Sequence, residues 1–409
     1  MTSQVVLMNS LSVAIASDSV ISTRDHEDAI RTRSTSEKII RISGEHQVLC
    51  MTSGLSAFHQ FPYEVLLWEW SRSLKGSLDS VKDYANSFIQ WLANSSHLRT
   101  EEIEGDEYIR CFEGFFRRFW NASKEFEAKD ATSIDDDFRS KYLSHVKLWT
   151  DWVEKQSLLP GLSDDWAESL SRKHNEILNQ KYEYWFGDDR PQIEEAEKLI
   201  KDAAKRCLSR SIYPPQTDLV FTGFGEAELL PHLVVINLYG LVDGRVRRSE
   251  IKDIEGDEGY FHFFGQADAS VQFVRGIDWE MKNSALNFVQ DVSEELAERV
   301  KNVAASHPDE DEVAKLLEDF GNLRQNLRIH LDEISEDQFV SPFMKVLNLS
   351  PEADLAKLAE SIVNIESMRQ AIDKSNPTVG GPIDVAVISK LRGCQWVRHK
   401  SLDDAIKSR

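Results

Sequence analysis

The sequence predicts an α+β fold that carries helical insertions. Alternating and continuous apolar runs, both typical of strands, gather in the first and last parts of the chain. The middle instead shows the 3–4 residue apolar spacing of helices. With 409 residues, the chain is long enough for two to three domains and a sizeable core.

Four strand-like segments open the chain. The second ends on Asp18, the third has Lys38 near its start, and the fourth breaks on Gly54. A helix-like stretch is expected from residue 57 onward. The four segments span residues 4–8, 11–17, 36–42 and 47–54.

The middle of the chain is predicted to be a helical insertion with a core of its own. Eight of the ten tryptophans of the whole chain lie between residues 68 and 185. The insertion is either a lid or oligomer contact, or simply a packed helical unit. Four phenylalanines share one helix face at i, i+3, i+4 and i+7 spacing: Phe112, Phe115, Phe116 and Phe119.

The last part of the chain returns to strands. Three strand-like segments that end in glycine turns precede a helix from about residue 267. A second helical segment, residues 308–336, interrupts this part, and a further helix and a glycine-led strand follow it. The three strands, the later helix and the final strand span residues 217–225, 233–244, 260–265, 355–372 and 377–388.

Thr2 follows Met1 directly, and this position suggests chemistry. If Met1 is removed, Thr2 carries both a hydroxyl nucleophile and a free α-amine, which can act as its base. An ordinary α-amine has a pKa of about 7.7–8.0, close to working pH. A neighbouring lysine would lower that pKa, an aspartate would orient the lysine, and a backbone N–H near a glycine would stabilise an oxyanion. Thr2, Asp18, Lys38 and Gly54 follow one another along the chain and could serve as nucleophile, orienting aspartate, activating lysine and oxyanion donor.

These residues resemble the opening of the proteasome-type N-terminal-nucleophile (Ntn) hydrolases, which include proteasome β subunits and the bacterial HslV peptidase. Residues 13–19, Val-Ala-Ile-Ala-Ser-Asp-Ser, resemble the strand of that family that ends in its aspartate. Lys38 begins a strand similar to the family's lysine strand, and residues 53–57 resemble its glycine turn. The resemblance implies a four-layer αββα sandwich. It also implies a threonine peptidase or amidohydrolase with catalytic Thr2, Asp18, Lys38 and Gly54.

Three positions depart from the family pattern. Gln266 stands where active members have a serine, and Asn376 and Val379 replace an aspartate and a serine. These accessory groups surround the threonine amine in active members. The alternative is therefore a catalytically inactive, proteasome-like assembly or interaction module.

The resemblance also implies a division of the chain and a set of partners. Substrates would be peptides or proteins, the chain would form a homo-oligomer, and an unfoldase or regulatory partner is possible. The core is expected to comprise residues 1–74, 216–305 and 351–409, with helical insertions or extensions at 75–215 and 306–350.

Composition excludes several other classes. The net charge of −21 opposes binding to nucleic acid or an anionic membrane. There is no signal segment and no apolar run of about 18 residues, so a cytoplasmic protein is expected. The four cysteines are scattered and the histidines lack zinc-ligand spacing, which predicts reduced thiols and no metal. Gly223-Phe-Gly225 lacks the remainder of a nucleotide-binding motif, so no cofactor is expected.

Overall fold

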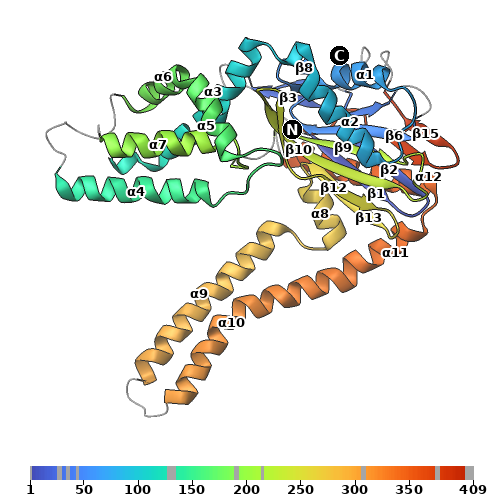
Figure 1. Cartoon of the computed structure of the whole chain (residues 1–409). Coiled ribbons are helices and arrows are strands. Elements are labelled where there is room, and N and C mark those ends of the chain that lie inside the picture. The colour runs from blue at the N-terminus through green and yellow to red at the C-terminus, as the bar shows by residue number, and fades with distance from the viewer. Residues whose placement is uncertain are drawn as a thin grey trace.

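The protein is described by a computed structural model that covers residues 2–24, 30–33, 37–42, 46–126, 135–187, 193–212, 216–304, 310–373 and 378–400. It combines two antiparallel sheets with helices, so the predicted α+β class is confirmed (Figure 1). Two groups of helices extend away from the sheets.

The first sheet contains the N-terminal strand and is antiparallel throughout. Its order is β13–β1–β2–β14–β15, so strands from both ends of the chain lie side by side. The strands are β1 (Ser3–Met8), β2 (Ser12–Ser17), β13 (Tyr260–Gly265), β14 (Asp384–Ser389) and β15 (Gly393–Arg398).

The second sheet has the order β11–β10–β9–β6–β5, and β12 also pairs with β10. These strands are β5 (Ile39–Arg41), β6 (Val48–Gly54), β9 (Thr217–Gly223), β10 (His232–Val242), β11 (Arg245–Arg248) and β12 (Lys252–Glu255). Two small hairpins pair β3 (Ile21–Arg24) with β4 (Ile30–Arg33) and β7 (Ala57–Phe58) with β8 (Phe61–Pro62).

The helix expected from residue 57 begins later, at Tyr63. The β7–β8 hairpin occupies the intervening residues, and its turn holds His59 at a positive φ of 53°. Pro62 then stands at the N-cap of the helix, where its missing N–H costs no hydrogen bond. The β7–β8 turn therefore delays the start of the helix that the apolar spacing predicts from residue 57.

Strands β1 and β2 of the first sheet are buried along their whole length. Side chains alternate between the faces of a strand, so each face is covered by a different neighbour. Val6 and Ile15 pack in a cluster shared with the second sheet, which contributes Leu49 and Val220. Residues on the opposite face pack against α12 (Glu352–Asp373) and α11 (Ser341–Leu349).

The second sheet packs its other face against α1 (Tyr63–Ser73) and α2 (Val81–Asn94). Trp70 and Phe88 are fully buried there and contact Phe221 of β9. Thus α2 belongs to the sheet's core, although it falls in the 75–215 stretch.

Helices α3 to α7, here called the insertion, share one hydrophobic cluster. All four phenylalanines of the predicted helix face are buried in it, which confirms that prediction. The helices are α3 (Glu101–Ala122), α4 (Asp136–Glu154), α5 (Asp164–Lys173), α6 (Asn175–Phe186) and α7 (Glu194–Arg206), with short 3₁₀ turns at Ser96–Leu98 and Lys124–Phe126.

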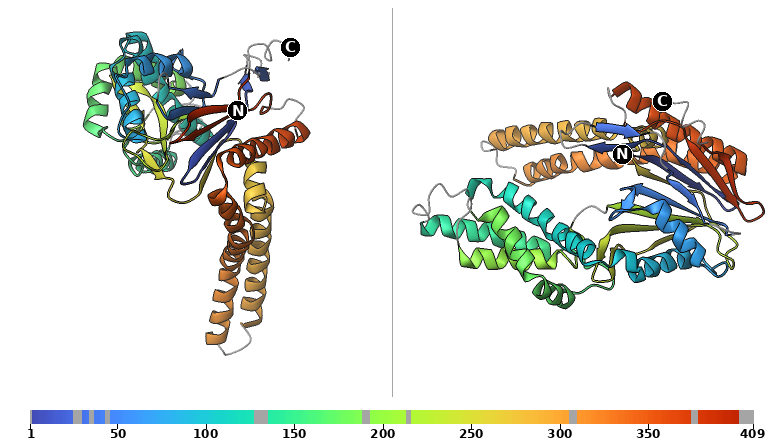
Figure 2. Two further views of the ribbon diagram at one scale, coloured as in Figure 1. Left: turned by 90° about the vertical axis from the view of Figure 1, so that its right-hand side faces the viewer. Right: turned by 90° about the horizontal axis from the view of Figure 1, so that it is seen from above.

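Helices α9 (Trp279–Ala304) and α10 (Glu310–Ser335) form a long hairpin, here called the arm. It follows the short helix α8 (Asp268–Arg275) and returns through a π-helical turn, Glu336–Val340. The arm projects away from the sheets, and in the view from above it extends on the same side as the insertion (Figure 2). α9 thus lies in the arm, although the sequence division grouped it with the core.

Among the helices of the described ranges, none is both long and apolar enough to span a bilayer.

Candidate active site

The β1–β2 hairpin of the first sheet brings Thr2 and Asp18 together. Thr2 immediately precedes β1, and Asp18 immediately follows β2. Because these strands pair antiparallel with Gln4 opposite Ser17, the start of one meets the end of the other. Lys38 reaches the same place from the second sheet, since it directly precedes β5.

The three side chains converge on a single carboxylate oxygen. The Thr2 hydroxyl donates to Asp18 Oδ1 at 2.9 Å, and Lys38 Nζ donates to the same oxygen at 2.6 Å. All three residues are buried: Asp18 is 0% exposed, and Thr2 and Lys38 are each 6% exposed. The structure therefore brings three of the four predicted catalytic residues into contact.

Backbone groups fix the Asp18 carboxylate in place. The Ser3 N–H donates to Oδ1 at 2.9 Å, and the N–H groups of Val20 and Gly380 donate to Oδ2 at 3.3 and 3.2 Å. Lys38 also donates to the Val20 carbonyl at 2.8 Å. Hydrogen bonds from several donors stabilise a buried carboxylate in its charged form. The aspartate can thus orient both the hydroxyl and the ammonium.

Burial is the main influence on the charge of Lys38. It lowers the pKa of the ammonium below its usual value of 10.5, while the Asp18 carboxylate opposes that change. A second pair nearby also acts on it: Lys400 lowers this pKa and Asp384 raises it. A lysine with a lowered pKa is a common feature of active sites, although structural ion pairs shift pKa values too.

Gly54 occupies the end of β6, at a φ of 108° that favours glycine. A Cβ atom there would overlap the carbonyl oxygen of Gln216, so the close approach of that backbone also requires glycine. Within the described ranges no hydrogen bond joins Gly54 to Thr2. Its predicted role as an oxyanion donor stays a prediction.

The accessory positions show how Thr2 is held from the other side. The Gln266 N–H donates to the Thr2 carbonyl at 2.6 Å, and the Thr378 hydroxyl donates to the Gln266 side chain at 3.0 Å. Val379 is buried, and Asn376 lies outside the described residues. Sequence reasoning missed Thr378, which places a hydroxyl one residue before the position where the family pattern expects a serine.

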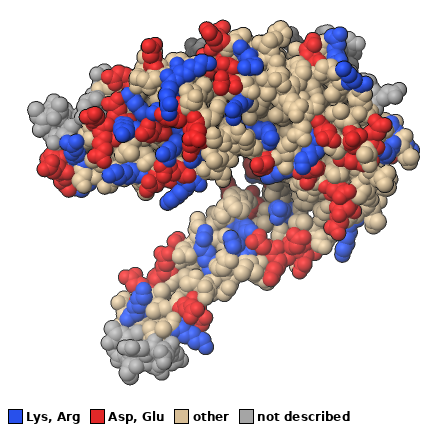
Figure 3. Space-filling model, in the orientation of Figure 1, with Lys and Arg blue, Asp and Glu red and all other residues tan. Residues whose placement is uncertain are grey.

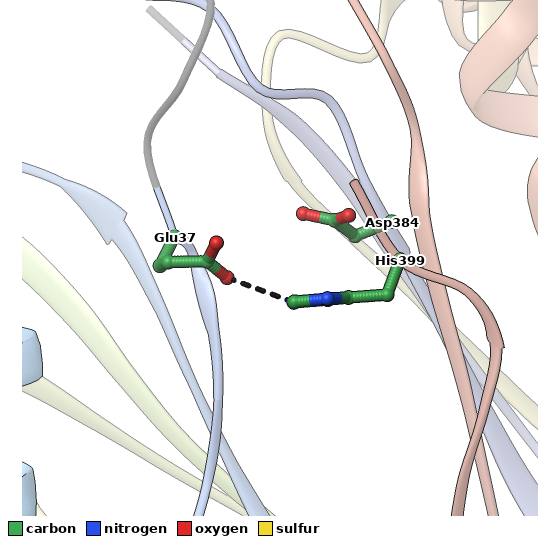
Figure 4. A group of neighbouring side chains, drawn as sticks. All are labelled: Glu37, Asp384 and His399. Carbon is green, nitrogen blue, oxygen red and sulfur yellow. Dashed lines mark hydrogen bonds and ion pairs between the residues drawn. The ribbon is translucent and has the colours of Figure 1, made fainter. Parts of the chain in front are cut away.

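A second charged cluster that sequence reasoning also missed lies beside Lys38. The Lys400 ammonium contacts Asp384 Oδ2 and lies 3.6 Å from Glu37 Oε1, while the Lys400 N–H donates to Asp384 Oδ1 at 2.9 Å. His399 Nε2 lies 3.2 Å from Glu37 Oε2 (Figure 4). Asp384 is next to the site because β14 pairs with β2, with Asp384 opposite Ser17.

Glu37, Asp384 and His399 each offer one potential metal-ligand atom, and these atoms all lie within 4.8 Å of one another. Lys400 already contacts both carboxylates and supplies their positive partner. A cation would have to displace this buried lysine, whose side chain is 4% exposed. The donor set therefore fits an ion-pair cluster better than a metal site.

Comparisons with known proteins give little further information. No protein-family model matches the sequence, and no curated protein matches it. Among solved structures, the chain is similar to an Anbu (Gly-1) mutant from Hyphomicrobium sp. strain MC1. This likeness has a TM-score of 0.29 and 9% sequence identity, and it covers 100% of this chain and 92% of that chain.

Proposed function

We propose that the protein is an N-terminal threonine hydrolase that cleaves amide bonds through an acyl-enzyme on Thr2. The observation that carries this proposal is the convergence of the Thr2 hydroxyl and the Lys38 ammonium on one oxygen of Asp18. A hydroxyl, a buried cation and a fixed carboxylate are the side chains that such a reaction needs around its nucleophile.

The reaction requires removal of Met1, which exposes the Thr2 α-amine. The amine takes the proton of Thr2 Oγ1 as this oxygen attacks the substrate carbonyl. The Gly54 N–H is assigned to the resulting oxyanion, and the Lys38 charge favours the unprotonated amine. The protonated amine then gives its proton to the leaving nitrogen as the C–N bond breaks. Water attacks the remaining ester with the same amine as base, which releases the acid and restores Thr2.

The core packing supports a four-layer αββα sandwich of the proteasome type. One cluster joins the two sheets, a second joins the second sheet to α1 and α2, and a third joins the first sheet to α11 and α12. In this assignment, Thr2, Asp18 and Lys38 occupy the positions of the family's catalytic residues.

Peptides or proteins are the proposed substrates. The N-terminus lies on the side of the sheets from which the insertion and the arm extend (Figure 2). The space-filling view shows a hollow between the insertion and the arm that is open to solvent (Figure 3). An extended chain can approach from that side. An unfoldase or regulatory partner, as the family resemblance implies, belongs to the same proposal.

A catalytically inactive interaction module is the second candidate. It is favoured by Gln266, whose side chain accepts the Thr378 hydrogen bond and replaces the expected serine, and by the apolar Val379. In this case Asp18 and Lys38 would be a structural ion pair that joins the two sheets.

Hydrolysis of a broad peptide library by three purified chains separates the two candidates. The wild type should cleave, Thr2→Ser should keep part of the rate because it retains a hydroxyl and an α-amine, and Thr2→Ala should lose at least about 100-fold. Cleavage by Thr2→Ala at the wild-type rate would refute a role for Thr2. No cleavage by a folded wild type whose first residue is Thr2 would favour the inactive module.

A further inference from the structure

The arm presents an apolar face that no described part of the chain covers. We propose that this face binds the same face of a second copy, so that two arms form an antiparallel four-helix bundle. The inference goes beyond catalysis and does not depend on it.

The two helices of the arm meet along an inner seam. Leu286 of α9 is 4% exposed in this seam, and Lys282 lies 2.5 Å from Asp332 of α10. This ion pair joins the start of α9 to the end of α10, so the helices are antiparallel. It also sets their register, which places residue 290 of α9 beside about residue 324 of α10.

A second stripe of apolar side chains runs along α9 outside that seam. Met281 and Phe288 are 70% and 68% exposed, and Val292 and Leu296 are each 37% exposed. These four residues are spaced by seven, four and four positions, which places them along one line of the helix. Each precedes a seam position by one residue, so the stripe is turned by about 100° from the seam.

α10 carries a matching stripe. Leu316 is 42% exposed and Leu323 is 39% exposed, and they are two turns apart. Leu316 likewise precedes a half-buried seam residue, Leu317. On each helix, the stripe lies one residue before the seam residues. Because the two helices are antiparallel and face each other across the seam, this offset turns both stripes toward the same side of the arm. The two stripes therefore form one surface.

This surface has the size that a dimer needs. From side-chain dimensions and exposure, its six apolar residues expose roughly 600 Å², at the upper limit of the largest patch on a typical monomer. Two copies would cover about 1,200 Å², which is the lower end of specific interfaces. Two antiparallel helices with one shared apolar face are also half of a four-helix bundle.

The surface is complementary to itself. A twofold axis midway between Phe288 and Val292 places Phe288 of one copy against Val292 of the other. It places Leu323 close to Leu323 of the other copy, because the register of the arm sets residue 324 beside residue 290. The same axis brings Glu280 next to Arg299 of the second copy, and both side chains are exposed.

The antiparallel arrangement also suits the charge of the chain. Each copy carries a net charge of −21, so contact between the main bodies of two copies would be unfavourable. A helix the length of α9 spans about 39 Å at 1.5 Å per residue. Opposed arms therefore keep the two bodies at opposite ends of the bundle.

Light scattering on the full chain at micromolar concentration tests this inference. The wild-type mass should be an even multiple of 46.8 kDa, and Phe288→Glu should halve it. Leu391→Glu is the matched control, since Leu391 is 94% exposed outside the arm, and it should leave the mass unchanged. A wild type of 46.8 kDa, or equal masses for Phe288→Glu and wild type, would overturn the proposal. Unchanged circular dichroism shows that Phe288→Glu remains folded.

Cysteine cross-linking tests the axis separately. Leu323→Cys should give a disulfide-linked dimer under mild oxidation, because the two copies of this residue meet near the axis. Ile329→Cys is the control on the same helix. Ile329 is 44% exposed, but it lies about 200° around the helix from the seam residue Leu327 and therefore outside the apolar stripe. Equal cross-linking of both variants, or none of Leu323→Cys, would contradict the arrangement. Peptide hydrolysis plays no part in either readout, so a failed catalytic proposal would leave both tests intact.

Discussion

At the scale of single residues, Asp18 determines the geometry of the candidate site. Its carboxylate accepts hydrogen bonds from the Thr2 hydroxyl, the Lys38 ammonium and three backbone N–H groups. A buried charge of this kind is stable only while its partners remain. The position of Thr2 is therefore linked to the charge of Lys38.

The lowered pKa of Lys38 predicts the pH dependence of acylation at Thr2. The rate should rise as the α-amine loses its proton below its ordinary pKa of about 8, because the Lys38 charge lowers the pKa of the amine. It should then fall at higher pH, as Lys38 loses its charge below its ordinary pKa of 10.5. Single-turnover labelling between about pH 5 and about pH 11, which spans both ionisations, measures this profile. A rate that stays level through the ordinary lysine pKa would contradict a role for the Lys38 charge.

His59 predicts a loss of stability in acid. Burial, and next the Arg110 charge, lower the pKa of His59 to about 4, and its Nε2 is buried without a hydrogen-bond partner within the described part of the chain. The unfolded chain binds this proton near pH 6.5 and the folded chain only near pH 4. The free energy of unfolding should therefore fall by about 3 kcal/mol between these pH values.

Urea unfolding at a series of pH values measures this effect against the variant His59→Asn. Asparagine tolerates the positive φ at this position and does not titrate. The difference in free energy of unfolding between wild type and variant should change with pH across that window. A difference that is constant with pH would rule out His59 as the source.

The sequence alone could predict the core of the site but not its surroundings. Thr2 and Asp18 lie at adjoining ends of one hairpin, so the pattern of two short strands already brings them together. Asp384 and Lys400 meet Lys38 only because β14 pairs with β2, a contact between distant parts of the chain. Lys400 belongs to no motif, and the predicted strand that holds Asp384, residues 377–388, does not itself indicate that it pairs with β2.

At the scale of elements, the insertion is attached to the second sheet through a buried acid. Glu107 of α3 is 2% exposed, forms an ion pair with Arg110 and lies 3.7 Å from Arg247 of β11. Gly240 of β10 faces this carboxylate with a φ of 143°. The absence of a side chain on Gly240 lets the acid approach the strand closely.

Gly240→Ala should separate steric overlap from backbone strain. An added Cβ would overlap the Glu107 carboxylate, so the variant should lose about 1–3 kcal/mol beyond the strain of a positive φ. Gly380→Ala is the control, because Gly380 has a φ of 145° and open space where a Cβ would lie. Urea unfolding of both variants gives the comparison. Equal losses would mean that the contact with Glu107 contributes nothing.

The arm shows why element patterns do not fix domain boundaries. The apolar spacing of α9 is the same whether the helix packs against a sheet or against one other helix. Sequence reasoning therefore grouped α9 with the core, whereas the structure places it in the arm. The exposure of Phe288 distinguishes the two cases, and it is visible only in three dimensions.

At the scale of the whole molecule, the sheets and the two projecting helical units, the insertion and the arm, suggest different roles. β1 and β2, which are buried along their whole length, position Thr2 and Asp18, and Lys38 joins them from the start of β5. The insertion and the arm extend from the same side, and under the proposed function they would guide or restrict access to Thr2. This division of roles is typical of active sites on a rigid scaffold.

The most direct test of the central claim is covalent labelling by a peptide epoxyketone, which reacts with both the hydroxyl and the free α-amine of an N-terminal threonine. In a chain whose first residue is Thr2, the N-terminal peptide should gain the mass of the probe. Thr2→Ala should abolish labelling, and Lys38→Ala should slow it by at least about 100-fold. If a small panel of such probes leaves a folded chain that starts at Thr2 unlabelled, Thr2 is not an N-terminal nucleophile.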